Sequence, residues 1–296
     1  MTEGTRARSR AADEPISPEG RAALAALARE ASVEMTWRDA GELDACRALL
    51  APGTPVFASH LPGQSWRQSV ETCIAIRGRG FEPVPHLPVR RLASAGELES
   101  VIADLVARAQ VARVLLIAGD APRPVGPFAS TLEVLATGVL AAHGIRRIFV
   151  AGHPEGHPQL AATELRRAER DKLAFAATHG IELAFLTQFV FEAGPFLRWV
   201  RMLREQGVQS RLVAGLAGPA RLATLFRYAL LCGVGPSIRA LGDRPAQLAR
   251  LVGERDPAAI AAAIARERAA LGDVGIHLFS FGGLARTCAW LQALSR

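Results

Sequence analysis

Residues 147–158 read RIFVAGHPEGHP, and this stretch decides how the chain is interpreted. Apolar residues that favour strands run directly into glycines, prolines, two histidines and a glutamate. A buried strand that ends in this way usually carries its chemistry on the following loop. Taken alone, the pattern also fits a proline-broken turn with solvated histidines. The same pattern recurs along the whole chain, however, and the recurrence predicts the fold.

Apolar runs of strand length occur eight times, each with a polar or glycine-bearing end, and segments with helical periodicity separate them. Strands that alternate with helices form βαβ units and a parallel sheet. No G-x-G-x-x-G fingerprint follows the first run, which argues against an open dinucleotide-binding sheet. The sequence therefore predicts one closed (β/α)8 TIM barrel over residues 16–296. The predicted strands are Ser32–Trp37, Pro55–Leu61, Phe81–Val89, Arg113–Asp120, Arg147–His153, Leu183–Phe191, Ser210–Leu216 and Gly275–Phe281.

The segments between the strands predict the outer helices of the barrel. Residues 95–110, for example, place five aliphatic side chains on one face and most of the charges off it. Residues 1–15 are basic, with no apolar stretch behind the arginines, and predict a disordered tail rather than a secretory signal. The other predicted helices cover residues 18–30, 39–50, 65–77, 129–142, 160–179, 194–206, 219–232, 257–271 and 284–295.

The composition argues against a membrane-spanning protein and against a nucleic-acid-binding protein. The 296 residues are half hydrophobic and carry a net charge of +7, yet no apolar run reaches the length of a membrane span. Aromatic residues are scarce, and no basic block alternates with them, which argues against nucleic-acid binding. The four cysteines form no C-x-x-C motif and predict buried, reduced thiols. We therefore expect a cytoplasmic enzyme with an anionic small-molecule substrate, as a monomer or a homo-oligomer.

The ends of the predicted strands carry most of the reactive side chains. In a (β/α)8 barrel these ends meet at one mouth, so we expect a ligand site there. His153 and His157 have a spacing that suits a helical metal site, but Pro154 and Pro158 disfavour the helix, and no metal is predicted. The candidates in chain order are Glu34, Ser59, His60, His86, Gly119, Asp120, His153, Glu155, His157, Thr187, Gln188, Phe189 and the turn at Gly282 and Gly283.

Several of these motifs resemble those of the methylenetetrahydrofolate reductase family, in its short bacterial form without a regulatory domain. The resemblance spans roughly residues 31–296. Its most specific signals are PEGHP at residues 154–158 and TQFVFE at residues 187–192, in this order. VPHL at 84–87, GD at 119–120, FAS at 128–130 and IHLFSF at 276–281 also match. Members of the family use NAD(P)H to reduce a bound FAD, which then reduces 5,10-methylenetetrahydrofolate to 5-methyltetrahydrofolate.

The resemblance implies a role for each matched residue. Glu34 would be the general acid that helps to open the folate ring, and its apolar neighbours predict a raised pKa. Asp120 would lie between flavin and folate, in a catalytic and a substrate-binding role. Gln188 and Phe189 would contact the folate, since a glutamine amide pairs with donor and acceptor edges of a pterin. The implied cofactor contacts are Ser59, His60, His86, Gly119, Asp120, Ala129, His153, His157 and Lys172.

The departures from the family pattern concern the cofactor. Ala118 stands where the family has an arginine, and His153 stands where it has a tyrosine. The second strand ends in Ser59-His60-Leu61, and Met35-Thr36-Trp37-Arg38 replaces a Phe-Phe-Pro-Pro motif. A lost charge-assisted contact predicts FAD binding weaker by about one to two decades. Two alternatives stay open: direct hydride transfer from NAD(P)H without flavin, and a one-carbon (methyl) transferase that binds folate. A non-catalytic binding protein is disfavoured, because Glu34, Asp120 and Gln188 are all retained.

Overall fold

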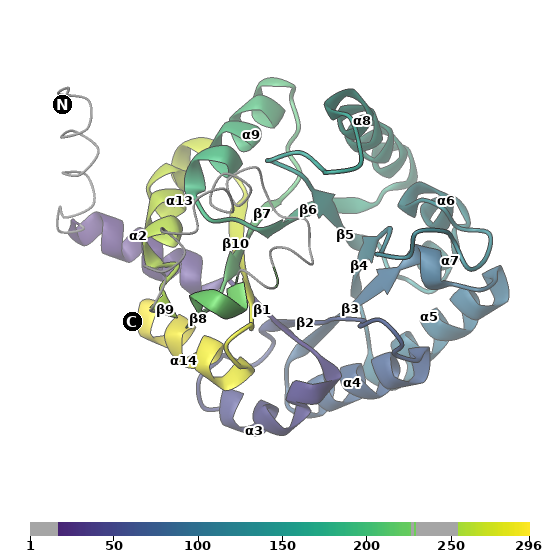
Figure 1. Ribbon diagram of the computed structural model, residues 1–296, viewed down its shortest axis with the longest axis horizontal. Helices are drawn as coiled ribbons and strands as arrows, with labels where there is room; N and C mark the ends of the chain where they lie inside the picture. Colours follow the sequence, from purple (N-terminus) through teal and green to yellow (C-terminus); the bar gives the residue numbers. More distant parts are fainter. Residues whose placement is uncertain (1–16, 226–227, 229–253) are drawn as a thin grey trace.

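The computed structural model describes residues 17–225, 228 and 254–296, and it contains a closed barrel of eight parallel strands (Figure 1). Each strand is a short apolar run, and the order around the barrel is β1-β10-β7-β6-β5-β4-β3-β2. The prediction of a (β/α)8 barrel is confirmed. The strands are β1 (Ser32–Met35), β2 (Pro55–Ala58), β3 (Glu82–Pro88), β4 (Arg113–Ile117), β5 (Arg147–Gly152), β6 (Glu182–Phe189), β7 (Leu212–Ala217) and β10 (Val274–Phe279).

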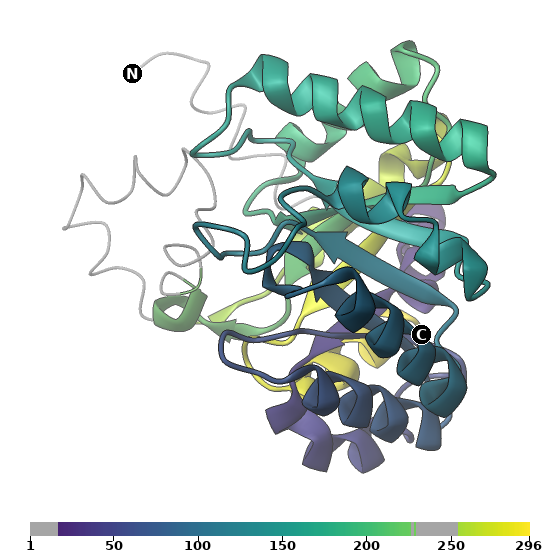
Figure 2. The same ribbon diagram turned by 90° about the vertical axis from the view of Figure 1, so that its right-hand side faces the viewer.

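Helices surround the barrel on its outer side, as the two views at right angles show (Figures 1 and 2). Their apolar faces pack on the outer faces of the strands and form the main hydrophobic core. Serine caps several of the N-termini; Ser94, for example, accepts a hydrogen bond from the Glu97 N–H. The helices are α2 (Pro18–Arg29), α3 (Leu43–Cys46), α4 (Trp66–Gly78), α5 (Ala95–Ala109), α6 (Thr131–Ala136), α7 (Val139–Ala142), α8 (Ala162–His179), α9 (Ala193–Glu205), α13 (Ala258–Leu271) and α14 (Leu284–Leu294), with short 3-10 helices η1 (Trp37–Glu42) and η2 (Val89–Arg91).

Three predicted helices differ from the structure. The helix over 39–50 is instead η1 followed by the single turn α3. The helix over 129–142 is divided in two, because Gly138 adopts a φ of 74° that no regular helix allows. The helix over 219–232 begins with the short strand β8 (Ala220–Arg221), which pairs with β9 (Glu254–Arg255), and most of its remainder lies outside the described residues. The tail predicted over 1–15 also lies outside them.

A separate apolar cluster fills the barrel interior. It joins side chains from β2 to β7, such as Phe57, Phe149 and Val213, and such a cluster can form only inside the closed sheet. Phe57 and Phe149 meet edge to face at 5.2 Å. This layer closes the barrel below its carboxyl ends, so polar groups above it line a mouth and not a pore. Among the described residues, no helix is long and apolar enough to cross a membrane.

The stretch at residues 147–158 forms β5 and the loop after it. Gly152 ends the strand, and a Cβ there would lie 2.6 Å from the Trp199 ring, so the glycine lets α9 pack closely on the sheet. Gly156 has a φ of 84°, which suits the turn that follows. The chain therefore leaves the strand through a tight turn that keeps His153 and His157 together, with their ring centres 5.3 Å apart.

Candidate active site at the carboxyl ends of the strands

A cluster of polar side chains lies inside the barrel, and Glu34 is at its centre. Glu34 Oε2 lies 3.3 Å from His86 Nε2 and 3.5 Å from His277 Nε2. Ser32 Oγ and His277 Nδ1 form a hydrogen bond of 2.8 Å, which fixes the imidazole plane. Phe57, in register with Glu34, packs its ring 4.6 Å from that of His277. Strands β1, β3 and β10 thus each contribute one ionisable group to a single buried cluster.

Three polar atoms of this cluster lack well-formed hydrogen bonds. Glu34 Oε2, His86 Nε2 and His277 Nε2 are buried, and none makes a well-formed hydrogen bond to another described residue. Buried polar groups normally find partners, because an unmet hydrogen bond in a low dielectric costs about 1–3 kcal/mol. Groups that face one another at ion-pair distance and still lack good partners are typical of sites that bind a polar ligand or move a proton.

The charge state of Glu34 differs from the expectation. Burial by itself would raise the pKa of this carboxyl, but the neighbouring His86 and His277 outweigh it and hold the pKa well below its usual range. The prediction of a raised pKa was wrong because the sequence shows only the apolar neighbours of Glu34 along its strand. The pKa of His277 is lowered, since complete burial outweighs the attraction of the Glu34 carboxylate. Glu34 is therefore a carboxylate at neutral pH.

Asp120 lies on the loop after β4, at the same end of the barrel but directed toward solvent. Its side chain is 62 % exposed and forms an ion pair of 2.7 Å with Arg91 on η2. The preceding Gly119 has a φ of 88°, and a Cβ there would lie 2.8 Å from Pro88 Cβ. Backbone geometry therefore requires glycine at 119. No hydrogen bond or ion pair among the described residues joins Asp120 to Glu34 or Gln188.

His60 and Ser59 follow β2 at the edge of the mouth. Ser59 is buried and its N–H donates to the Met35 carbonyl at 2.9 Å, so its backbone extends the pairing with β1. His60 packs against Trp66, with ring centres 4.3 Å apart and ring planes tilted by 33°, and forms a 2.8 Å hydrogen bond to Ser69 Oγ. Burial, with the charge of Arg91 nearby, lowers the pKa of His60 to about 4.

Basic side chains gather around the ends of β5 and η2. Burial lowers the pKa of His153 to about 4, and the charges of His157, Lys172 and Arg166 lower it further in the same direction. Burial and the charge of Arg90 lower the pKa of His157, and burial also lowers that of Lys172. We call His153, His157, Lys172 and Arg90 the basic edge. Its two imidazoles are neutral at neutral pH, and an anion bound beside them would favour their charged forms.

Ala129, another predicted cofactor contact, lies beside this edge. Its backbone carbonyl accepts a 3.0 Å hydrogen bond from Arg90 Nε, and its N–H donates to Glu133 Oε2 at 2.5 Å. Both polar groups of the Ala129 backbone are therefore already engaged. The contact orients the Arg90 side chain along the mouth of the barrel.

The TQF motif at 187–189 forms a β-bulge at the end of β6. The register of β6 against β7 shifts between Leu186 and Phe189, and the Thr187 hydroxyl accepts the Gly215 N–H at 2.9 Å in place of a backbone carbonyl. The bulge leaves Gln188 exposed, with its Oε1 accepting from the Phe189 N–H at 3.1 Å. Phe189 is buried in an aromatic cluster with Phe279, Phe281 and Phe191, so packing explains it without a ligand.

His277 is the residue that inspection of the sequence missed. The segment 276–281 matches the last strand of the family, but the match assigns no role to its histidine. The available signal was a single histidine in an otherwise apolar strand. Only the register of the closed barrel, which pairs Ser32 with His277 and Glu34 with Phe57, shows that it faces Glu34.

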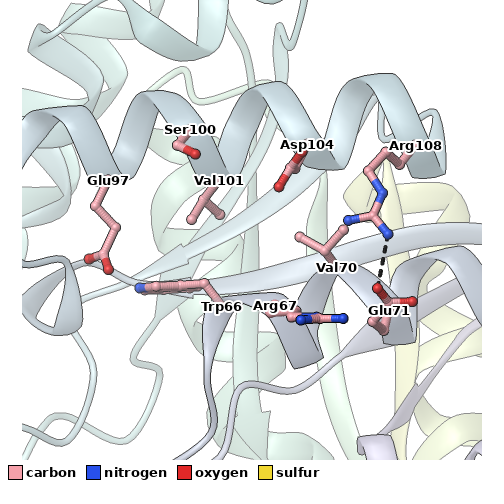
Figure 3. A pocket seen from close by; sticks show the side chains of 9 residues that line it. All are labelled: Trp66, Arg67, Val70, Glu71, Glu97, Ser100, Val101, Asp104 and Arg108. Carbon is pink, nitrogen blue, oxygen red and sulfur yellow. Dashed lines mark hydrogen bonds and ion pairs between the residues drawn. The ribbon is translucent and has the colours of Figure 1, made fainter.

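One hollow of the surface lies away from this mouth, between α4 and α5 (Figure 3). It has a volume of about 400 Å³ and is lined by Trp66 and by charged side chains, of which Arg108 and Glu71 form an ion pair of 2.9 Å. The hollow is open and lies on the helical layer. Because no unpartnered buried group among the described residues points into it, we assign it no function.

The histidines at the mouth predict how stability depends on pH. His60 and His153 have a pKa of about 4 in the folded chain but about 6.5 when unfolded, so between these values the unfolded chain binds more protons. We expect the free energy of unfolding to fall as the pH decreases through this interval, by at most about 1.4 kcal/mol per pH unit for each histidine. Urea unfolding at several pH values measures this slope.

His60→Gln and His153→Gln should each weaken the dependence of the free energy of unfolding on pH. His179→Gln is the matched control, because His179 lies exposed at the end of α8. A slope that stays the same in both mouth variants would contradict the assignment of half-buried, neutral imidazoles.

No family model matches the chain. Among solved structures, dihydropteroate synthase from Thermus thermophilus is similar over 89% of this chain and 90% of its own, with 14% identity and a TM-score of 0.48. A xylose isomerase domain protein from Planctomyces limnophilus is similar over 89% and 93%, with 16% identity and a TM-score of 0.33. Likenesses this distant carry no argument about chemistry. The closed (β/α)8 barrel is therefore established by the chain's own strand order and register.

Proposed function

We propose that this chain is an enzyme that reduces 5,10-methylenetetrahydrofolate to 5-methyltetrahydrofolate with NAD(P)H, by way of bound FAD. The observation that supports this most is the buried cluster of Glu34, His86 and His277 inside the barrel, with polar atoms that lack good partners. Two of the motifs that resemble the methylenetetrahydrofolate reductase family, VPHL at 84–87 on β3 and IHLFSF at 276–281 on β10, contribute His86 and His277 to this cluster.

The proposed reaction needs a proton and a hydride. Protonation of N10 of the folate lets its bond to the methylene carbon break, and the resulting iminium accepts the hydride at that carbon. Because Glu34 is a carboxylate at neutral pH, it cannot supply this proton as an isolated acid. We infer that the proton is shared by Glu34 and His86 across their 3.3 Å contact, and that the pair is the general acid.

The basic edge would suit the diphosphate of FAD. His153, His157, Lys172 and Arg90 come from three separate elements of the chain, and burial or neighbouring positive charge depresses the pKa of three of them, so an anion would stabilise their charged forms. Lys172 and Arg90 would hold the phosphate oxygens. When bound, FAD would relay a hydride from NAD(P)H to the folate.

Asp120 is the residue that fits the flavin least well. Its carboxylate is exposed and paired with Arg91, and Ala118 leaves no guanidinium at the end of β4. This observation favours the second candidate, in which NAD(P)H passes its hydride directly to the folate.

Flavin reconstitution tests the proposal. We expect the purified chain, mixed with excess FAD and desalted, to retain a visible flavin band that NAD(P)H bleaches and methylenetetrahydrofolate restores. Lys172→Gln should weaken FAD binding by about 10- to 100-fold, since a hydrogen bond to a charged group contributes about 1.5–3 kcal/mol. Arg167→Gln, an exposed change on the same helix, is the control.

Other outcomes would replace the proposal. If FAD does not bind while NAD(P)H still reduces methylenetetrahydrofolate, the direct hydride transfer is correct. If folate binds but no reduction occurs with or without FAD, a one-carbon transferase takes its place.

A further inference from the structure

Two cysteines from opposite ends of the chain lie side by side in the core. Cys46 at the end of α3 and Cys288 in α14 are both buried and free, and their sulfur atoms are 3.2 Å apart. The Cys288 thiol donates its hydrogen to the Cys46 sulfur. Cys73, by contrast, is buried without a sulfur neighbour among the described residues.

Contacts on both sides of the pair hold the two helices in register. Glu42 Oε2 accepts the Ala285 N–H at 2.7 Å, at the first turn of α14. Gln292 Nε2 donates to the Ala48 carbonyl at 3.1 Å, near the other end of the same helix. Figure 1 shows α3 and α14 as neighbours on one side of the barrel. The short distance between the sulfur atoms is therefore fixed by flanking contacts and not by the cysteines alone.

We propose that Cys46 and Cys288 are an oxidation site, at which a peroxide joins their sulfur atoms in a disulfide. In the first step the Cys46 thiolate attacks one peroxide oxygen, the O–O bond breaks, and hydroxide leaves, so that Cys46 becomes a sulfenic acid. In the second step the Cys288 sulfur attacks the Cys46 sulfur, the S–O bond breaks, and the S–S bond forms. The thiol protons leave with the two oxygens as two molecules of water.

The surroundings determine which cysteine reacts first. The hydrogen bond from the Cys288 thiol lowers the pKa of Cys46, and the same bond, together with burial, raises the pKa of Cys288. Cys46 is therefore the nucleophile and Cys288 the resolving thiol. Both are buried, so we expect the reaction to follow local opening of α14 and to be slower than that of an exposed thiol.

A disulfide here would join the two ends of the barrel. α3 follows β1, α14 follows β10, and these strands pair at only two positions, Ser32 with His277 and Val33 with Leu278. This is the shortest ladder in the barrel; the ladder between β10 and β7, for comparison, pairs six residues of each strand. The oxidised chain should therefore unfold at a higher temperature than the reduced chain, because a bond between residues so far apart in sequence lowers the conformational entropy of the unfolded chain.

Peptide mapping of the full chain tests the proposal. The reduced protein is treated with hydrogen peroxide, alkylated under denaturing conditions and digested with trypsin. We expect one linked pair, the peptide 39–47 that holds Cys46 and the peptide 287–296 that holds Cys288. Dithiothreitol should release both peptides. The melting temperature should be higher for the oxidised sample than for the reduced one.

Cysteine variants test whether the disulfide forms between Cys46 and Cys288 and not with another cysteine. Cys73→Ser should form the same link, whereas Cys288→Ser should form none and should leave a sulfenic acid on Cys46 that dimedone traps. Circular dichroism checks that each variant is folded, and the map of the unmodified chain stands if one is not. Alkylation of both cysteines after peroxide treatment, or a link that uses Cys73 or Cys232, would overturn the proposal.

Discussion

Glu34→Gln is expected to lower the rate of NAD(P)H-dependent reduction of methylenetetrahydrofolate by about 10²–10⁴-fold, the usual contribution of a general acid. Glutamine has the shape of glutamate, so the strand and the folate site should remain intact. It carries no charge, however, and cannot share a proton with His86 across the 3.3 Å contact. Stopped-flow oxidation of NAD(P)H with saturating folate measures the loss, and folate affinity is measured separately.

A titration distinguishes this catalytic role from a structural one. In the native chain the Glu34 carboxylate raises the pKa of His277 against the opposing effect of burial. Glu34→Gln should therefore lower the pKa of His277 further, which NMR of the imidazole protons can follow. Glu30→Gln, an exposed change just before β1, should alter neither rate nor titration. Unchanged turnover in Glu34→Gln would remove this residue from the proposed mechanism.

The barrel could be predicted from sequence because its evidence is local. Each strand is a short apolar run, and helices carry their own apolar stripes and caps, as with Ser94 ahead of α5. Repetition then determines the fold, since eight such units have few ways to bury their strands. The strand ends could be found for the same reason, and Glu34, His86 and Gly119 do lie at the carboxyl ends of β1, β3 and β4.

The contacts that define the site could not be predicted, because they depend on register between strands far apart in sequence. The neighbours of Glu34 along its own strand are apolar, whereas His277, which approaches it at 3.5 Å, lies on the last strand. The ion pair of Asp120 with Arg91 likewise joins the loop after β4 to η2. Cys46 and Cys288 are far apart in the sequence, yet their sulfur atoms are 3.2 Å apart in the fold.

The β6 bulge packs closely against Gly215 on β7, and a substitution there should have a large effect on stability. Gly215→Ala should lower the free energy of unfolding by about 2–3 kcal/mol, the upper part of the usual cost of overpacking a close-packed core. A Cβ at this position would lie 2.5 Å from the Thr187 carbonyl oxygen, 2.6 Å from Phe279 Cε2 and 2.9 Å from the Gln188 carbonyl carbon. Backbone atoms of the bulge cannot move away as a flexible side chain can, so β6 and β7 would have to separate.

Gly275→Ala is a matched control for this prediction. Gly275 also lies in a barrel strand, but the three atoms nearest to a Cβ there all belong to Arg211, whose Nη2 is 2.8 Å away at the far end of a flexible side chain. The arginine can shift at little cost, so this variant should unfold within about 0.5 kcal/mol of the native chain. Urea unfolding of both variants measures the difference. Equal stabilities would show that the bulge accommodates a methyl group, and the close approach of β6 and β7 at this position would then not require glycine.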